Sequence, residues 1–290
     1  MVRKRELPDA TSKPVDTRPF WSAFWDPARP EEADAWYYLD EAKFWYLLRF
    51  LPAGGKTLEV GCGSGRMSRF LAEAGFDTTA LDYEPGAIEC ASRQLDRSGL
   101  RGALILGDGE RLPFSSESFQ VVLSTGLLEH FEDPSSIVRE MVRVLCPGGL
   151  FYSDVVPKKF SLFRSLDFLR RNRGELFERP FSRRQITDLL RQAGLSDIAV
   201  FPAGLLPPRL PLVERWQFTR RLQNRVAAVS SRFARALDDT KVAELLGVYY
   251  FACARKPRLA SQQTVSGVTA GRDVTSVGLV HLSRGRARAS

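Results

Sequence analysis

A short apolar run and a helical pattern are separated by a loop with glycine at every second position, at Gly61, Gly63 and Gly65. Glu59 lies two positions before the first of these glycines. Glycine permits a tight turn and close approach of a ligand to the backbone, and the helix start beyond it offers free N–H groups. A phosphate-binding P-loop needs lysine after the glycines, and a dinucleotide fingerprint needs glycine, but Arg66 follows. The spacing therefore indicates a ligand of a different kind.

Two aspartates stand at the ends of later apolar segments. Asp82 ends 76–82 and Asp108 ends 102–108. A nucleoside presents a cis-diol and an exocyclic amine, and two separately placed carboxylates can accept hydrogen bonds from them. Each aspartate alone could be a turn residue or a strand-end cap, but together with the glycine loop they favour a nucleoside site.

Short apolar segments alternate with helical patterns along the chain. This alternation predicts an α/β fold, a Rossmann-like doubly wound and mostly parallel seven-stranded sheet with helices on both faces. Ligands of such sheets bind at the carboxyl ends of the strands, near the point where strand order reverses. The expected strands are 57–60, 76–82, 102–108, 118–125, 148–156, 196–201 and 245–255; the expected helices are 34–51, 66–74, one opening at Glu84-Pro85, one from Asp133-Pro134 to about 145, and 182–193.

The glycine spacing E-x-G-x-G-x-G resembles the first motif of class I S-adenosylmethionine-dependent methyltransferases. Further segments resemble that family in the same order, namely "GDGERLPF" (107–114), "FQVVLSTGLLEHFEDP" (119–134) and "EMVRVLCPGGLFYSDVV" (140–156). The resemblance covers roughly 34–201 and is greatest to the small-molecule branch related to ubiquinone and menaquinone biosynthesis enzymes. It implies S-adenosyl-L-methionine as the cofactor.

The resemblance also implies roles for individual residues. Asp82 would hold the ribose hydroxyls, Asp108 would face the adenine amino group, and Tyr83 would stack on the adenine. Glu59 would reach the amino group of the methionine part or hold the glycine loop through backbone amides. The expected cofactor contacts are Glu59, Gly61, Cys62, Gly63, Gly65, Asp82, Tyr83, Asp108, Gly109, Thr125 and, from the aromatic N-terminal helix, Tyr38. Those helix aromatics could equally pack on the sheet edge.

Methyl transfer needs a base only when the acceptor must lose a proton. His130 is the one histidine outside the C-terminal tail, which holds His281. It lies just past the fourth strand, so we expect it to be a base or an acceptor-positioning group; the alternative is an exposed residue at a helix start. Glu129 and Asp154 are weaker candidates.

Basic residues concentrate in one region of a chain whose net charge is +8. Residues 157–235 hold 17 lysines and arginines against 6 acidic residues. This region overlaps two insertions, about 157–181 and 202–244, which we expect to form a basic helical cap. Within it, apolar residues from Trp216 to Leu237 recur at near-helical spacing, with arginines on the remainder. Such a helix suits a membrane surface or an anionic acceptor, or it is a lid with a solvated basic face.

The remaining composition sets the domain limits. We expect a disordered leader over 1–18, a methyltransferase domain over 19–256 and a disordered tail over 257–290. The four cysteines show no metal-binding spacing, so we expect reduced thiols in a cytoplasmic protein and no metal site. No apolar run approaches the length of about 20 residues that a membrane span needs.

The predicted function is therefore methyl transfer from S-adenosylmethionine to a small-molecule or lipid-like acceptor. A nucleic-acid or protein methyltransferase remains an alternative, although "STGLLEH" stands where a nucleic-acid enzyme would carry an N/D-P-P-Y-like motif. A non-catalytic cofactor-binding protein is another, because glycines and acids show binding and not turnover. The sequence leaves the acceptor atom and the oligomeric state open.

Overall fold

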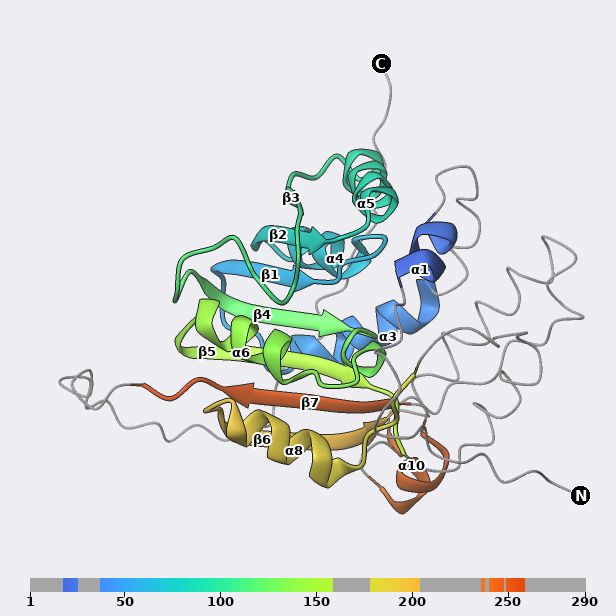
Figure 1. The fold of residues 1–290 in the computed structure, drawn as a ribbon, viewed down its shortest axis with the longest axis vertical. Helices are drawn as coiled ribbons and strands as arrows, with labels where there is room; N and C mark the ends of the chain where they lie inside the picture. Colours follow the sequence, from blue (N-terminus) through green and yellow to red (C-terminus); the bar gives the residue numbers. More distant parts are fainter. Residues whose placement is uncertain are drawn as a thin grey trace, which may run out of the picture. The chain divides into compact units, whose positions relative to one another are not determined.

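The computed structural model describes residues 18–25, 37–158, 178–203, 236–237, 240–247 and 249–258. Its centre is one seven-stranded sheet in the order β3-β2-β1-β4-β5-β7-β6 (Figure 1). Strands β1 to β5 pair in parallel, and β7 is antiparallel to both β5 and β6. The strands are β1 (Lys56–Val60), β2 (Asp77–Asp82), β3 (Ala103–Leu106), β4 (Phe119–Thr125), β5 (Leu145–Val155), β6 (Ser196–Ala203) and β7 (Tyr249–Arg255). The predicted mostly parallel, seven-stranded α/β sheet is confirmed.

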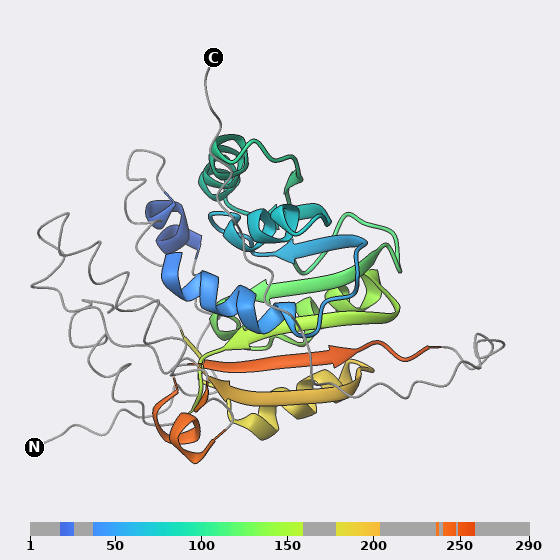
Figure 2. The same ribbon diagram turned by 180° about the vertical axis from the view of Figure 1, so that it is seen from behind.

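Helices cover both faces of this sheet. In Figure 1, α6 and α8 lie on the near face; the reverse view in Figure 2 brings α3 and α4 to the front. The described helices are α1 (Arg18–Phe24), α3 (Tyr37–Leu48), α4 (Arg66–Glu73), α5 (Pro85–Arg97), the 3₁₀ helix η1 (Leu128–His130), α6 (Ser135–Val144), α8 (Arg183–Gln192) and α10 (Lys241–Leu246). In these parts of the chain no helix is long and apolar enough to cross a membrane.

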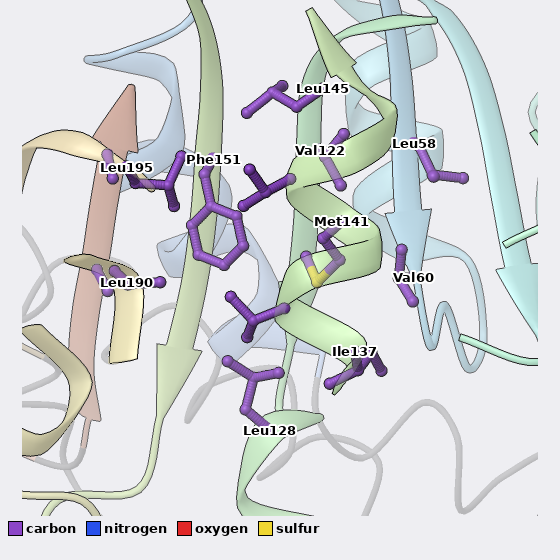
Figure 3. Packing of buried hydrophobic residues seen from close by; sticks show 14 of the residues in the cluster. Leu58, Val60, Val122, Leu128, Ile137, Met141, Leu145, Phe151, Leu190 and Leu195 are labelled. Carbon is purple, nitrogen blue, oxygen red and sulfur yellow. The ribbon is translucent and has the colours of Figure 1, made fainter. Parts of the chain in front are cut away.

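Alternation along β4 divides the core into two layers. Val122 faces α6 and packs with Met141 and Phe151, as Figure 3 shows. Its neighbours Val121 and Leu123 point to the opposite face, into a cluster that includes residues of α3 and α4. Successive side chains of a strand point to opposite faces, so a strand buried on both faces reads as a continuous apolar run. The run in the sequence around 119–123 has this cause.

The residues at two helix N-termini explain why those helices begin where they do. Pro85 occupies the first turn of α5 after Glu84, as the sequence predicts, because its missing N–H needs no partner there. Ser182 begins α8 with a reciprocal capping box, in which its hydroxyl accepts from the N–H of Gln185 and the Gln185 side chain accepts from the N–H of Ser182.

Several predicted strand boundaries are wrong. Strand β5 begins at Leu145 and not at 148, and β6 ends at Ala203 and not at 201. The last strand begins at Tyr249 and not at 245, because Thr240 caps a short helix, α10, that takes up Leu245. Strand β3 ends at Leu106, so Asp108 lies in the turn beyond it. Helix α1 was not predicted.

Several predictions concern residues outside the described ranges. They include the leader up to residue 17, the tail from 259, and most of both cap insertions, among them the stretch from Trp216 to Arg235. The cap and the disordered ends therefore stay predictions.

Candidate functional site

The glycine loop leaves β1 next to the position where strand order reverses, and it is tied to the end of β2. The N–H groups of Gly61 and Cys62 donate to the carbonyl of Leu81 at 2.8 and 3.0 Å. The N–H of Gly63 donates to Oδ2 of Asp82 at 2.9 Å. Gly61 and Gly63 have φ of +68° and +49°, in the left-handed region that glycine adopts without steric cost. The loop is thus held in a turned shape before any ligand arrives.

At the position that a Cβ would occupy, each glycine of the loop lies against a different neighbouring residue. A Cβ on Gly61 would lie 2.7 Å from the Leu127 side chain, which follows β4. A Cβ on Gly63 would lie 2.6 Å from the ring of Trp25, just past α1, and one on Gly65 would lie 2.6 Å from Cβ of Ala91 in α5. The three glycines therefore let the exit of β4, the end of α1 and the body of α5 close around the loop.

Asp82 is buried at the end of β2, and both of its oxygens accept backbone hydrogen bonds. Besides Gly63, the N–H of Glu84 donates to Oδ1 at 3.0 Å. Burial raises the pKa of the Asp82 carboxyl, and the backbone hydrogen bonds from Glu84 and Gly63 oppose that rise. Each carboxylate oxygen carries two lone pairs, so capacity remains for ligand hydroxyls.

Glu59 is buried in β1 and contacts the first turn of α4. Its Oε2 accepts from the N–H of Ser68 at 2.8 Å and from the Ser68 hydroxyl at 2.6 Å. The two roles predicted for this acid, contact with the methionine amino group and support of the glycine amides, stay predictions.

The segment after β3 crosses toward the same edge of the sheet. A Cβ on Gly109 would lie 2.8 Å from the Ile137 side chain and 3.0 Å from that of Val60, the last residue of β1, so the backbone passes close over β1. Asp108 beside it is exposed, and its Oδ1 accepts from the N–H of Glu110 at 2.8 Å. Tyr83, past the end of β2, is 37% exposed. The Asp108 carboxylate and the Tyr83 ring, both predicted to contact the cofactor, are therefore accessible at this edge of the sheet.

The exit of β4 carries the remaining predicted residues. Thr125 is partly buried at the strand end, and η1 then places His130 against Trp21 of α1, with ring centroids 4.9 Å apart. His130 is therefore a packed residue and not the exposed helix-start residue of the alternative interpretation. Tyr38 belongs to α3, but its side chain lies outside the described residues.

Sequence reasoning missed a buried cation beside this exit. Nζ of Lys43 in α3 lies 2.9 Å from Oδ2 of Asp154, near the end of β5, and 4.7 Å from the ring centroid of Tyr249. The signal was a lysine three and four residues before Tyr46 and Leu47, on the buried face of an apolar helix.

Glu129 is buried in the same place. Burial first, and then the charge of Asp154, raise the pKa of its carboxyl to about 8. The structure therefore places Glu129 close enough to Asp154, the partner of Lys43, for their like charges to interact, and these two are the weaker candidates for a base. The His130 ring contacts Trp21 of α1.

Another missed contact links α1 to the cofactor edge. The hydroxyl of Ser22 donates to Oε1 of Glu84 at 2.7 Å, two residues past Asp82. Within the described ranges no cluster of three or more histidine, cysteine, aspartate or glutamate side chains could hold a metal ion. All four cysteines are free thiols.

A glycine loop tied to an acid at the end of β2, on a parallel sheet with an antiparallel β7, is the arrangement implied by the resemblance to class I S-adenosylmethionine-dependent methyltransferases. Residues 58–153 match the family model described as a methyltransferase domain. Over that segment the chain is therefore similar to methyltransferase domains, and it has the Rossmann-like fold that the sequence predicts.

Curated relatives agree with this assignment. The ubiquinone biosynthesis O-methyltransferase of Xylella fastidiosa (strain 9a5c) is 30% identical over 146 residues, which cover 50% of this chain and 58% of that protein. The enzyme of the same name from Xanthomonas axonopodis pv. citri (strain 306) is 33% identical over 144 residues, covering 48% and 59%. The match thus spans less than two thirds of these relatives' length.

Solved structures share the fold. A chain of the complex between the Haloferax volcanii Trm112 methyltransferase activator and a methyltransferase superposes with a TM-score of 0.56 at 19% identity, covering 82% of this chain and 98% of that chain. A SAM-dependent methyltransferase from Thermotoga maritima gives 0.53 at 18% identity, covering 79% and 97%. At these identities the likeness concerns the fold alone.

Proposed function

We propose that this protein transfers a methyl group from S-adenosylmethionine to a small-molecule acceptor. The observation that carries the proposal is the glycine loop at the carboxyl end of β1, closed by the hydrogen bond from Gly63 to Asp82. The glycine loop, the buried Asp82 and the exposed Asp108 are spaced over three adjacent strand ends, which suits a nucleoside better than a pyrophosphate.

The residues present fit that cofactor. Asp82 retains lone pairs for the ribose hydroxyls, Asp108 is accessible to the adenine amino group, and the exposed Tyr83 ring can stack on the base. Gly61 and Gly63 let the loop turn tightly with the Leu127 and Trp25 side chains packed against it. The bound cofactor would supply a methyl group on a positively charged sulfur, and much of the rate can come from holding the acceptor in line with it.

Oxygen in a small or lipid-like molecule is the acceptor that we favour. Support comes from the relatives, which are named ubiquinone biosynthesis O-methyltransferases. The 17 basic residues between 157 and 235 support an anionic acceptor and contact with an anionic membrane surface. A cytoplasmic site of action, with reduced thiols, completes the proposal.

His130 is proposed to face the acceptor, as a base or as a positioning group. It lies at the exit of β4, one of the strand ends around the site, and its ring is fixed against Trp21. If it is a base, His130→Ala should lower turnover by about 10²–10⁴-fold with little change in cofactor affinity. A loss below about tenfold would assign it to positioning alone.

Incubation with methyl-labelled S-adenosylmethionine and an extract of small molecules and lipids tests the function. We expect label to move into one class of extractable compound, with formation of S-adenosylhomocysteine. Label transferred to added RNA or protein instead would support the alternative methyltransferase classes, and cofactor binding without any transfer would support a non-catalytic binding protein.

A further inference from the structure

Three ionisable side chains from three elements meet beside Gly126, the first residue after β4. Lys43 of α3 and Asp154 of β5 form an ion pair with 2.9 Å between Nζ and Oδ2. A Cβ placed on Gly126 would have Oε1 of Glu129 at 3.8 Å and Nζ of Lys43 at 4.0 Å as its nearest neighbours in the described part of the chain, apart from the adjacent residues. A Cβ at this position would therefore lie in ordinary van der Waals contact with both polar atoms.

Glu129 keeps one side-chain oxygen whose hydrogen bonding is incomplete within the described part of the chain. The residue is 3% exposed, and its Oε2 has no hydrogen-bond partner within the described part of the chain. A buried polar atom without a partner is unfavourable, and a ligand that supplies a hydrogen bond relieves this. The carboxyl is thus suited to receive a polar group beside Gly126.

We propose that Glu129 and Lys43, with Asp154 behind Lys43, form the acceptor site for a neutral hydroxyl of the phenol or enol class. Lys43 holds the acceptor oxygen, and Glu129 takes its proton. A lone pair of that oxygen forms the bond to the methyl carbon, the former carbon–sulfur pair returns to sulfur, and the hydroxyl proton passes to the Glu129 carboxylate. This inference rests on the proposed function and leaves a positioning role for His130.

The charges around Glu129 favour this chemistry. Asp154 of β5 and Glu178 before α8 act to raise its pKa, Lys43 of α3 acts to lower it, and burial is the largest influence. A pKa near 8 is closer to that of a phenol than an ordinary glutamate's is, which makes the carboxylate a better matched base. A protonated amine would instead meet the Lys43 ammonium, a contact between like charges.

Carbon-13 NMR of the Glu129 side-chain carboxyl in the full-length protein tests the inference. Phenol is the probe, and benzylamine is the control of similar size that carries a positive charge. We expect phenol, and not benzylamine, to move the Glu129 resonance and its titration midpoint. Glu129→Gln should weaken phenol binding at least about tenfold, as loss of a hydrogen bond to a charged group implies. Glu132→Gln, the same change at an exposed neighbour, should bind phenol like the wild type.

Titration of the same samples with S-adenosylhomocysteine separates the two proposals. A resonance unmoved by phenol, or moved equally by benzylamine, overturns the acceptor site, and the wild-type spectrum decides this without any variant. Phenol binding unchanged in Glu129→Gln overturns it as well. A phenol response without S-adenosylhomocysteine binding contradicts the proposed function and not the hydroxyl site.

Discussion

The carboxyl ends of β1 and β2 and those of β4 and β5 both bury acidic side chains, but they stabilise them differently. Asp82 accepts from two backbone N–H groups, and Glu59 accepts from the N–H and hydroxyl of Ser68. At the other pair, Asp154 meets the ammonium of Lys43, and Glu129 keeps an oxygen without a described partner. The first pair of strand ends is fixed by nearby backbone, whereas the second depends on distant side chains.

Under the proposed function, this difference separates two tasks within one sheet. Backbone donors fix the shape of the glycine loop, as preorganised recognition requires. The cluster at β4 and β5 carries charges that can change protonation, as a reacting acceptor requires. Each substitution proposed next changes the contacts at one of these two pairs of strand ends.

The largest effect is expected from Lys43→Met. It leaves the Asp154 carboxyl buried without its ammonium, and breaking a buried ion pair costs about 3–5 kcal/mol of unfolding free energy. Urea denaturation would measure this loss of unfolding free energy. Asp154→Asn in the same chain should recover part of the loss. Arg93→Met, which breaks the largely exposed pair with Glu89, should cost less than about 1 kcal/mol; equal losses for Lys43 and Arg93 would show that the buried pair has no special weight.

Asp82→Ala should weaken cofactor binding by about 1.5–3 kcal/mol, because it removes a charged hydrogen-bond acceptor and frees the N–H of Gly63. Titration calorimetry with S-adenosylhomocysteine gives the affinity. Asp77→Ala, at the exposed opposite end of β2, is the matched control and should bind like the wild type. Unchanged affinity in the Asp82 variant would remove this acid from the cofactor site.

Gly65→Ala should give the smallest of these effects, a loss of about 1–3 kcal/mol in unfolding free energy beyond that of its control. Its Cβ would lie 2.6 Å from Cβ and 3.1 Å from Cα of Ala91, so α4 and α5 must move apart. Gly99→Ala is the control, since its φ of +64° is close to the +68° of Gly65 but a Cβ there meets nothing within 4 Å. Thermal unfolding that treats both variants alike would mean that the close helix approach adds nothing.

The sequence predicted the glycine loop and the acid at the end of β2, but not the contact between Lys43 and Asp154, for a physical reason. The turn at Gly61 and Gly63 and the acid at the end of β2 depend on residue types at short spacing, which a single sequence displays. Lys43 and Asp154 are 111 positions apart, and periodicity shows that each is on a buried face without showing which residue it meets. The contact between Trp21 and His130 escaped for the same reason, since it depends on the unpredicted helix α1.

Titration calorimetry of the full-length protein with four ligands tests the central claim most directly. The account predicts that S-adenosylmethionine and S-adenosylhomocysteine bind, with no detectable heat of binding for NAD or ATP, because the loop lacks the lysine of a P-loop and the glycine of a dinucleotide fingerprint at Arg66. Binding of NAD together with silence of S-adenosylmethionine would contradict it.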